Sequence, residues 1–136
     1  MNLGKKHVLI ADSDERALIA LEHLLEDEGF DTTTAWSTSE TVDLLEKKSF
    51  DLMLVADHPP ELNCEAVLRK AKSEGRHVPL LVLENKPRHP FAEPYLMTLG
   101  ARKIVHKWKA EEVKKAVTGT LNSSRGISVA GSEKVA

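Results

Sequence analysis

Polar side chains that could bind a metal ion or form ion pairs directly follow the apolar segments of this chain. They are Asp12, Ser13, Asp14, Asp57, His58, Glu84 and Lys107. Carboxylates are common ligands of Mg²⁺, which demands a near-octahedral shell of oxygen atoms. In an open α/β sheet, ligands bind beyond the carboxyl ends of the strands, where the strand order reverses. These side chains therefore predict a polar site at one edge of a sheet.

Other kinds of reactive site have little support in the sequence. The six histidines include no pair at the i, i+4 spacing of a helical zinc site, so surface or capping roles are expected for them. The sequence contains no glycine-rich phosphate loop and no nucleophile elbow. Cys64 is the only cysteine, which excludes an intramolecular disulfide and suits a reducing cytoplasm.

Composition and charge indicate a single cytoplasmic globular domain. The chain has 136 residues, of which 41% are hydrophobic and 29% charged, as is ordinary for such domains. The formal net charge of −2 gives no electrostatic sign of nucleic-acid binding. The N-terminal apolar run is too short for a signal peptide or a membrane span. We therefore expect a domain that binds neither nucleic acid nor a membrane.

Strand-length apolar segments alternate with helix-length amphipathic segments along the chain. The expected strands are His7–Ala11, Asp31–Trp36, Asp51–Ala56, Val78–Leu83 and Lys103–His106. The expected helices are Ser13–Glu28, Ser37–Lys48, Asn63–Lys72, a short helix late in the proline-rich segment between the last two strands, and Ala110 to about Leu121. This alternation predicts an α/β fold with a parallel sheet covered by helices on both faces. Residues 122–136 are small and polar, so we expect a domain of residues 1–121 and a flexible tail or linker after it.

Four stretches resemble the receiver domain of bacterial response regulators, over roughly residues 6–121. They are HVLIADSD, FDLMLVADHPP, VPLLVLENK and LGARKIVHK, in the order and separation of that family. The resemblance implies a doubly wound, CheY-like (flavodoxin-like) (βα)5 sheet with strand order 2-1-3-4-5. It also implies phosphoryl transfer from a histidine kinase to an aspartate of the third strand. An acid pair after the first strand would hold Mg²⁺, and a hydroxyl residue and a lysine would bind the phosphoryl oxygens.

Several of the residues that this chemistry requires are replaced. With Asp51 and Pro60 as anchors, the phosphoryl-accepting position falls on Ala56, whose methyl group cannot be phosphorylated. Asp57 is one residue further, and a shift of one residue turns a strand side chain to the opposite face. Ser13 replaces the second acid of the pair, so Asp12 alone is a poor Mg²⁺ site and more readily a helix-capping acid. We expect no Mg²⁺ binding and no other cofactor.

The ends of the fourth and fifth strands carry a partial match. Glu84 replaces the hydroxyl residue, whereas Lys107 matches the lysine of the family. An ion pair between Glu84 and Lys107 is predicted, with a Glu84 side chain turned to solvent as the alternative. Asp12 is the other plausible partner of Lys107. Asp12, Ala56, Asp57, Glu84 and Lys107 would then form the remnant of a phosphorylation site.

These departures favour a non-enzymatic pseudo-receiver that docks a protein, such as a histidine kinase or a downstream effector, without phosphorylation. The resemblance locates the docking surface at the fourth helix, fifth strand and fifth helix, and its candidate residues are Phe91, Tyr95, Ile104 and Trp108. Large aromatic residues with a polar rim are typical of binding hot spots. The alternative is an active receiver phosphorylated at Asp57. A small flavodoxin-like enzyme is a third possibility, but the cofactor-binding loop it requires is missing from the sequence.

Overall fold

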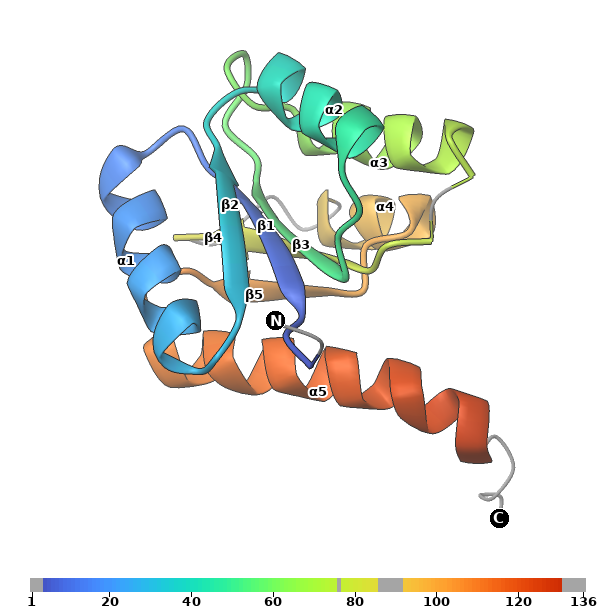
Figure 1. The fold of residues 1–136 in the computed structure, drawn as a ribbon. Helices are drawn as coiled ribbons and strands as arrows, with labels where there is room; N and C mark the ends of the chain where they lie inside the picture. The colour runs from blue at the N-terminus through green and yellow to red at the C-terminus, as the bar shows by residue number, and fades with distance from the viewer. Residues whose placement is uncertain (1–3, 76, 86–91, 131–136) are drawn as a thin grey trace.

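Five parallel strands form one sheet in the order β2-β1-β3-β4-β5 in a computed structural model of the chain (Figure 1). The structure describes residues 4–75, 77–85 and 92–130, and within α4 and α5 it describes the side chains of residues 94–122. The strands are β1 (His7–Ala11), β2 (Asp31–Ala35), β3 (Leu52–Ala56), β4 (Leu80–Glu84) and β5 (Lys103–His106). The predicted α/β class and strand order are confirmed.

Helices cover both faces of the sheet. They are α1 (Glu15–Asp27), α2 (Thr38–Lys47), α3 (Cys64–Ser73), α4 (Ala92–Leu99) and α5 (Ala110–Ala130). In Figure 1, α1 and α5 lie on one face, and α2, α3 and α4 lie on the other. In the part of the chain that the structure describes, no helix is both long and apolar enough to span a membrane.

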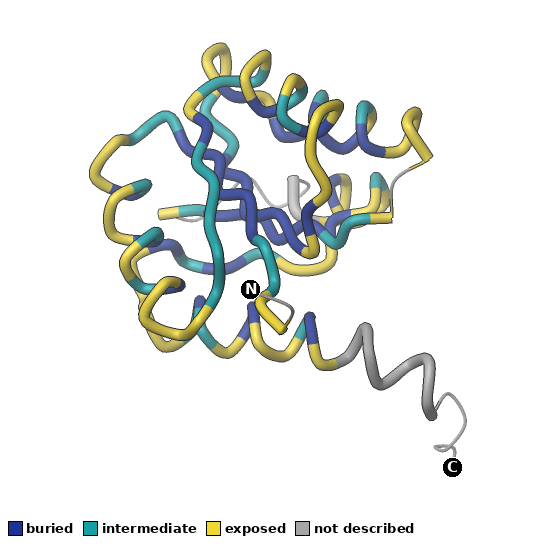
Figure 2. The backbone as a smooth tube through the Cα atoms, viewed as in Figure 1, coloured by how far each residue is buried: buried dark blue, intermediate teal, exposed yellow. Residues whose placement is uncertain are grey.

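The three central strands are buried because helices cover them on both faces. Every residue of β3 is buried, and so are the last four residues of β1 and the first four of β4 (Figure 2). β2 lies at an edge of the sheet, and its three threonines are only half-buried. Continuous apolar runs are typical of parallel strands covered on both faces. The sheet thus provides a rigid base for the loops at its carboxyl edge.

Side-chain caps begin the first three helices. Asp14 accepts a hydrogen bond from the backbone N–H of Arg16 at the start of α1. Ser37 accepts from Glu40 at the start of α2, and Asn63 caps α3. Each cap satisfies a backbone donor that has no partner within the helix. The Asp14 cap also fixes the direction in which the loop after β1 enters α1.

The last helix is longer than predicted. The sequence pattern places its end near Leu121, but α5 continues to Ala130. Its buried side chains, among those described, end at Leu121, where the apolar periodicity also ends. A helix can continue past its packed face because each further residue adds a backbone hydrogen bond. The domain boundary at residue 121 stays a prediction.

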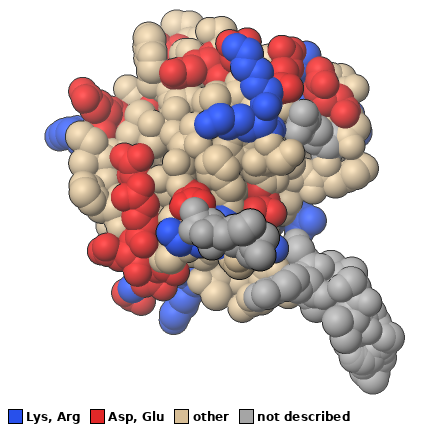
Figure 3. Space-filling model, viewed as in Figure 1, with Lys and Arg blue, Asp and Glu red and all other residues tan. Residues whose placement is uncertain are grey.

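Charged side chains of both signs are mixed over much of the surface. On the face drawn in Figure 3, acidic side chains gather over α1, and lysine and arginine side chains lie among acidic ones over α2 and α3. One such mixed cluster joins Lys70 of α3 to Glu46 of α2 and Glu74, with N–O distances of 2.7 and 2.8 Å. These two carboxylates raise the pKa of Lys70 above its ordinary range. The view agrees with the near-neutral net charge of the sequence.

Candidate functional site

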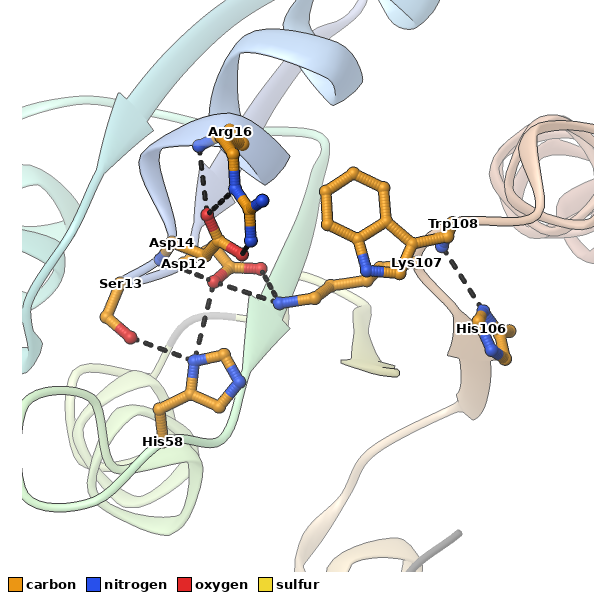
Figure 4. Close-up of polar contacts among 8 residues, drawn as sticks. All are labelled: Asp12, Ser13, Asp14, Arg16, His58, His106, Lys107 and Trp108. Carbon is orange, nitrogen blue, oxygen red and sulfur yellow. Dashed lines mark hydrogen bonds and ion pairs between the residues drawn. The ribbon is translucent and has the colours of Figure 1, made fainter. Parts of the chain in front are cut away.

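A fully buried ion pair occupies the carboxyl edge of the sheet (Figure 4). The ammonium of Lys107 lies 3.0 Å from Asp12 Oδ2 and 3.3 Å from Asp12 Oδ1. Both side chains have 0% exposure, although the two residues are 95 positions apart in the sequence. Asp12 directly follows β1 and Lys107 directly follows β5, so the ion pair spans the ends of β3 and β4. Each charge depends on the other, because an isolated buried charge is very costly.

Asp12 also organises the start of α1. Its Oδ1 atom accepts a hydrogen bond from the backbone N–H of Asp14 at 2.9 Å. Asp14 itself is directed to Arg16, and this hydrogen bond from the guanidinium lowers the pKa of the Asp14 carboxyl. The capping acid predicted from the sequence was Asp12, but the N-cap of α1 is Asp14. Asp12 contributes to the same turn while it neutralises Lys107.

His58 closes the site from the loop after β3. Its Nδ1 atom is hydrogen-bonded to Ser13 Oγ at 2.8 Å and lies 3.5 Å from Asp12 Oδ1. The contact joins the loop after β1 to the loop after β3, as Figure 4 shows. The sequence placed His58 at the predicted polar edge but gave it no more specific role than a surface or capping one. The one available signal was its position two residues past the end of a buried strand.

Glu84 meets Lys107 through its backbone. The Lys107 N–H donates to the Glu84 carbonyl oxygen at 2.8 Å, which continues the pairing of β4 with β5. Among the residues that the structure describes, the carboxylate paired with the Lys107 ammonium is that of Asp12 and not that of Glu84. The predicted Glu84–Lys107 ion pair is therefore wrong. The Glu84 side chain is half-buried, whereas that of Asp12 is fully buried. Asp12 is thus already removed from water, so pairing with a buried ammonium costs it no further desolvation.

Ala56 and Asp57 end the third strand. Ala56 is the last residue of β3 and is fully buried, so its methyl group lies within the core. The Asp57 carboxylate accepts a hydrogen bond from the backbone N–H of Cys64, at 3.0 Å, and so is directed to the start of α3. This direction agrees with the change of face expected from a shift of one residue. The structure therefore places Asp57 in contact with α3, whereas Asp12, Ser13, His58 and Lys107 form the polar cluster.

The predicted partner surface is distributed over several elements. Trp108 is 44% exposed, and its ring centroid lies 5.8 Å from the Lys107 ammonium, close enough for a cation–π interaction. The Tyr95 hydroxyl donates to Glu65 of α3 at 2.9 Å, although its side chain is 47% exposed. Ile104 is half-buried against the core. Phe91 lies outside the described residues.

The sequence profile of the response regulator receiver domain matches residues 8–118. Among curated proteins, the chain is similar to the response regulator SaeR of Staphylococcus aureus, with 29% identity over 101 residues. The match covers 74% of this chain and 43% of that protein. The chain thus spans less than half the length of this curated relative.

Solved structures of receiver domains share the fold. A CheY-like receiver domain from Methanospirillum hungatei superimposes with a TM-score of 0.79 at 19% identity, covering 90% of this chain and 98% of that one. The receiver domain of the sensor histidine kinase PA1611 from Pseudomonas aeruginosa superimposes with a TM-score of 0.76 at 17% identity, covering 88% and 99%. That structure contains a magnesium ion in the active-site cleft. At these identities the likeness shows the fold.

Proposed function

This chain belongs to the response regulator receiver domain family, and from that premise we propose that it is a pseudo-receiver that binds a partner protein without being phosphorylated. Receiver domains act in two-component signalling, where they interact with histidine kinases and effectors. The single observation that carries the proposal is the buried ion pair between Asp12 and Lys107. It engages the two groups that the family uses to bind a metal ion and a phosphoryl group.

The ion pair supports a site that is closed to a phosphoryl group. In the family the lysine after the fifth strand binds phosphoryl oxygens, but here the Lys107 ammonium contacts both oxygens of Asp12. Ala56 offers no oxygen to accept a phosphoryl group in the position that the family pattern assigns. Breaking a buried ion pair by removing one partner costs about 3–5 kcal/mol. An incoming anion would have to compensate a cost of that order to recruit Lys107.

The donor atoms also fit Mg²⁺ poorly, and we assign no step to that ion. A magnesium site needs oxygen ligands from one or two carboxylates that are free to coordinate. Both oxygens of Asp12 already contact a cation, and Ser13 Oγ is hydrogen-bonded to His58. The methyl group of Ala56 supplies no ligand. A divalent cation would therefore have to displace the Lys107 ammonium from Asp12.

The same contacts favour one fixed conformation of the carboxyl edge. Asp12 ties Lys107, at the start of the loop after β5, to the start of α1. Lys107 in turn precedes Trp108, whose exposed ring lies over its ammonium. A permanent ion pair thus takes the place of a phosphorylation cycle, and the partner meets a surface in a single state. We infer that this surface includes Tyr95, Ile104 and Trp108.

The proposal is tested by exposing the chain to a radiolabelled acyl phosphate with Mg²⁺. Three chains are compared: wild type, Asp57→Asn, and the double variant Ser13→Asp/Ala56→Asp, which restores the missing carboxylates. The wild type should acquire no label, and the double variant should acquire it because both an acceptor and a second metal ligand are present. Label on the wild type that alkali or hydroxylamine releases, as expected of an aspartyl phosphate, would contradict the proposal. Its loss in Asp57→Asn would establish the alternative, an active receiver with a displaced acceptor.

A further inference from the structure

A cavity lies at the opposite edge of the sheet from the Asp12–Lys107 pair. It has a volume of about 300 Å³ and lies where α3 ends, where α4 ends, and where β4 and β5 begin. α3 and α4 lie side by side in Figure 1 and contact each other. Ligand-binding cavities in proteins begin at about this size. This volume suits a small molecule rather than a peptide.

The inner wall of the cavity is apolar. Met53 of β3 is fully buried, Leu68 of α3 is 7% exposed, and Leu99 of α4 packs against the core. Gly100 has a φ of +120°, which lets the chain turn from α4 into β5 beside Leu68. These residues belong to elements that the core already holds in place. The wall is therefore preformed, as is usual for ligand sites.

The rim of the cavity is basic. Lys72, His77 and Arg102 line it, and none of the described residues that line the cavity is acidic. Within the described part of the chain, Lys72 and Arg102 form no ion pair. Their neighbour Lys70 differs, because it contacts Glu46 and Glu74. Two uncompensated cations therefore lie beside an apolar wall.

The helix ends at the cavity do not use these cations as caps. The Lys70 and Lys72 carbonyl oxygens at the end of α3 accept from the N–H groups of Glu74 and Gly75. At the end of α4, the Leu96 and Met97 carbonyl oxygens accept from Ala101 and Gly100. Backbone turns thus satisfy carbonyl groups that basic side chains often contact in a last turn. The charges of Lys72 and Arg102 are left available to a ligand.

We propose that this cavity binds a small organic anion, with its carboxylate or phosphate group held by Lys72 and Arg102 and its apolar body against Leu68 and Leu99. Arginine binds such oxyanions through two parallel hydrogen bonds, and lysine adds a compact positive charge. The site is remote from Asp12 and independent of whether the chain is phosphorylated. It would allow a small molecule to act on α4, which contributes Tyr95 to the inferred partner surface.

The test is a titration of the ¹⁵N-labelled chain with benzyl phosphate, followed by the backbone amide shifts. Benzyl alcohol, which has the ring without the charge, and inorganic phosphate, which has the charge without the ring, are titrated in parallel. Benzyl phosphate should give saturable shifts at Val78, Leu99 and Gly100. Benzyl alcohol should bind at least about tenfold more weakly, since one lost charge-assisted hydrogen bond is of that order. Inorganic phosphate should also bind at least about tenfold more weakly, because it loses the burial of the apolar ring. Equal affinity for either fragment, or saturable shifts only near Asp12 and Lys107, would overturn the proposal.

Charge-removing variants test the assigned cations. Lys72→Ala and Arg102→Ala should each weaken benzyl phosphate binding about tenfold, and the double variant should show no saturation. Lys115→Ala is the matched control, because it removes an exposed lysine of α5 that is remote from the cavity lining. It should bind as the wild type does. All three positions are exposed, so the variants should keep the wild-type melting temperature. An equal loss in Lys115→Ala would show that only the net charge matters.

Discussion

The Asp12 carboxylate illustrates how one side chain can serve two structural purposes. It neutralises Lys107, which follows the edge strand β5. It also accepts a hydrogen bond from the backbone N–H of Asp14 in the turn after β1. A surface ion pair such as Lys5–Asp31, with both side chains nearly half exposed, contributes little to stability. The buried pair differs because neither charge can return to water without unfolding. Its removal should therefore affect both stability and the carboxyl-edge loops.

Asp12→Asn should lower the free energy of unfolding by about 3–5 kcal/mol, because it leaves the Lys107 ammonium buried without a counter-ion. Urea unfolding followed by circular dichroism measures this change. The double variant Asp12→Asn/Lys107→Met should recover part of the loss, since no charge is then buried. Lys5→Ala is the control and should change the free energy by only about 0–1 kcal/mol. A loss in Asp12→Asn as small as that of the control would contradict the role given to the pair.

Millimolar Mg²⁺ should leave the fluorescence of Trp108 unchanged in a Trp36→Phe background, which removes the other tryptophan. The physical reason is that the oxygens of Asp12 are engaged by Lys107, whose ammonium lies 5.8 Å from the indole ring. The matched variant Ser13→Asp/Ala56→Asp adds two carboxylates and should give a saturable change. Saturation in the wild-type site would show that Lys107 yields Asp12 to the metal ion.

At the scale of elements, short polar signals determine where the helices begin. Asp14, the cap of α1, also forms an ion pair with Arg16, with an N–O distance of 3.4 Å. Three effects lower the pKa of Asp14. They are the hydrogen bond from the Arg16 side chain, the hydrogen bond from the Arg16 backbone N–H, and the positive charges of Arg16 and Lys107. A carboxyl group of this kind stabilises the folded state while it is ionised. Its contribution must therefore depend on pH.

Asp14→Ala should cost about 1 kcal/mol at neutral pH, as is typical for the loss of an N-cap. The pKa in the folded state lies below the ordinary value of 3.8. The stabilisation is therefore fully present above the ordinary value and is lost as the pH falls through the folded-state pKa. Urea unfolding of both chains, measured from neutral pH down to about pH 3, gives the difference at each pH. A difference that grows as the pH falls would refute the assignment.

At the scale of the whole molecule, the buried side chains of α5 that the structure describes end at Leu121. The buried side chains of α5 are Val113, Ala116, Val117 and Leu121. They lie on the face that α5 turns toward the sheet and α1, and the helix then projects beyond the sheet in Figure 1. The stability of the domain should thus depend on the chain up to Leu121. The backbone helix after this point has no packed face among the described side chains.

A chain that ends at Leu121 should keep its melting temperature within about 2–3 °C, because no described buried side chain is removed. A chain that ends at Thr120 is the matched comparison, since it also removes Leu121, which is 7% exposed. Burial of a leucine contributes about 1.5–3 kcal/mol, so this shorter chain should melt several degrees lower. Differential scanning calorimetry distinguishes the two. A large drop on ending at Leu121 would mean that the segment after it docks on the domain.

The sequence by itself determined most of the elements, and it predicts that the acceptor is missing. Buried strands such as β1 and β3 appear as continuous apolar runs, and caps such as Ser37 and Asn63 act within three residues of themselves. Local periodicity and capping chemistry are sufficient for both. The prediction that Ala56 replaces the acceptor needed only the family pattern around it. The strand order also came from the resemblance, because alternation alone indicates a parallel sheet but not its order.

Only the tertiary structure decided which charges meet. Lys107 had two candidate carboxylates, and its choice of Asp12 over Glu84 depends on which group is buried beside the ammonium at the edge of the sheet. The contact of His58 with Ser13 likewise joins two loops separated by 45 positions. The cavity at the opposite edge is assembled from α3, α4 and three strand ends, so no local pattern reveals it. Such contacts depend on distances in space that residue spacing does not encode.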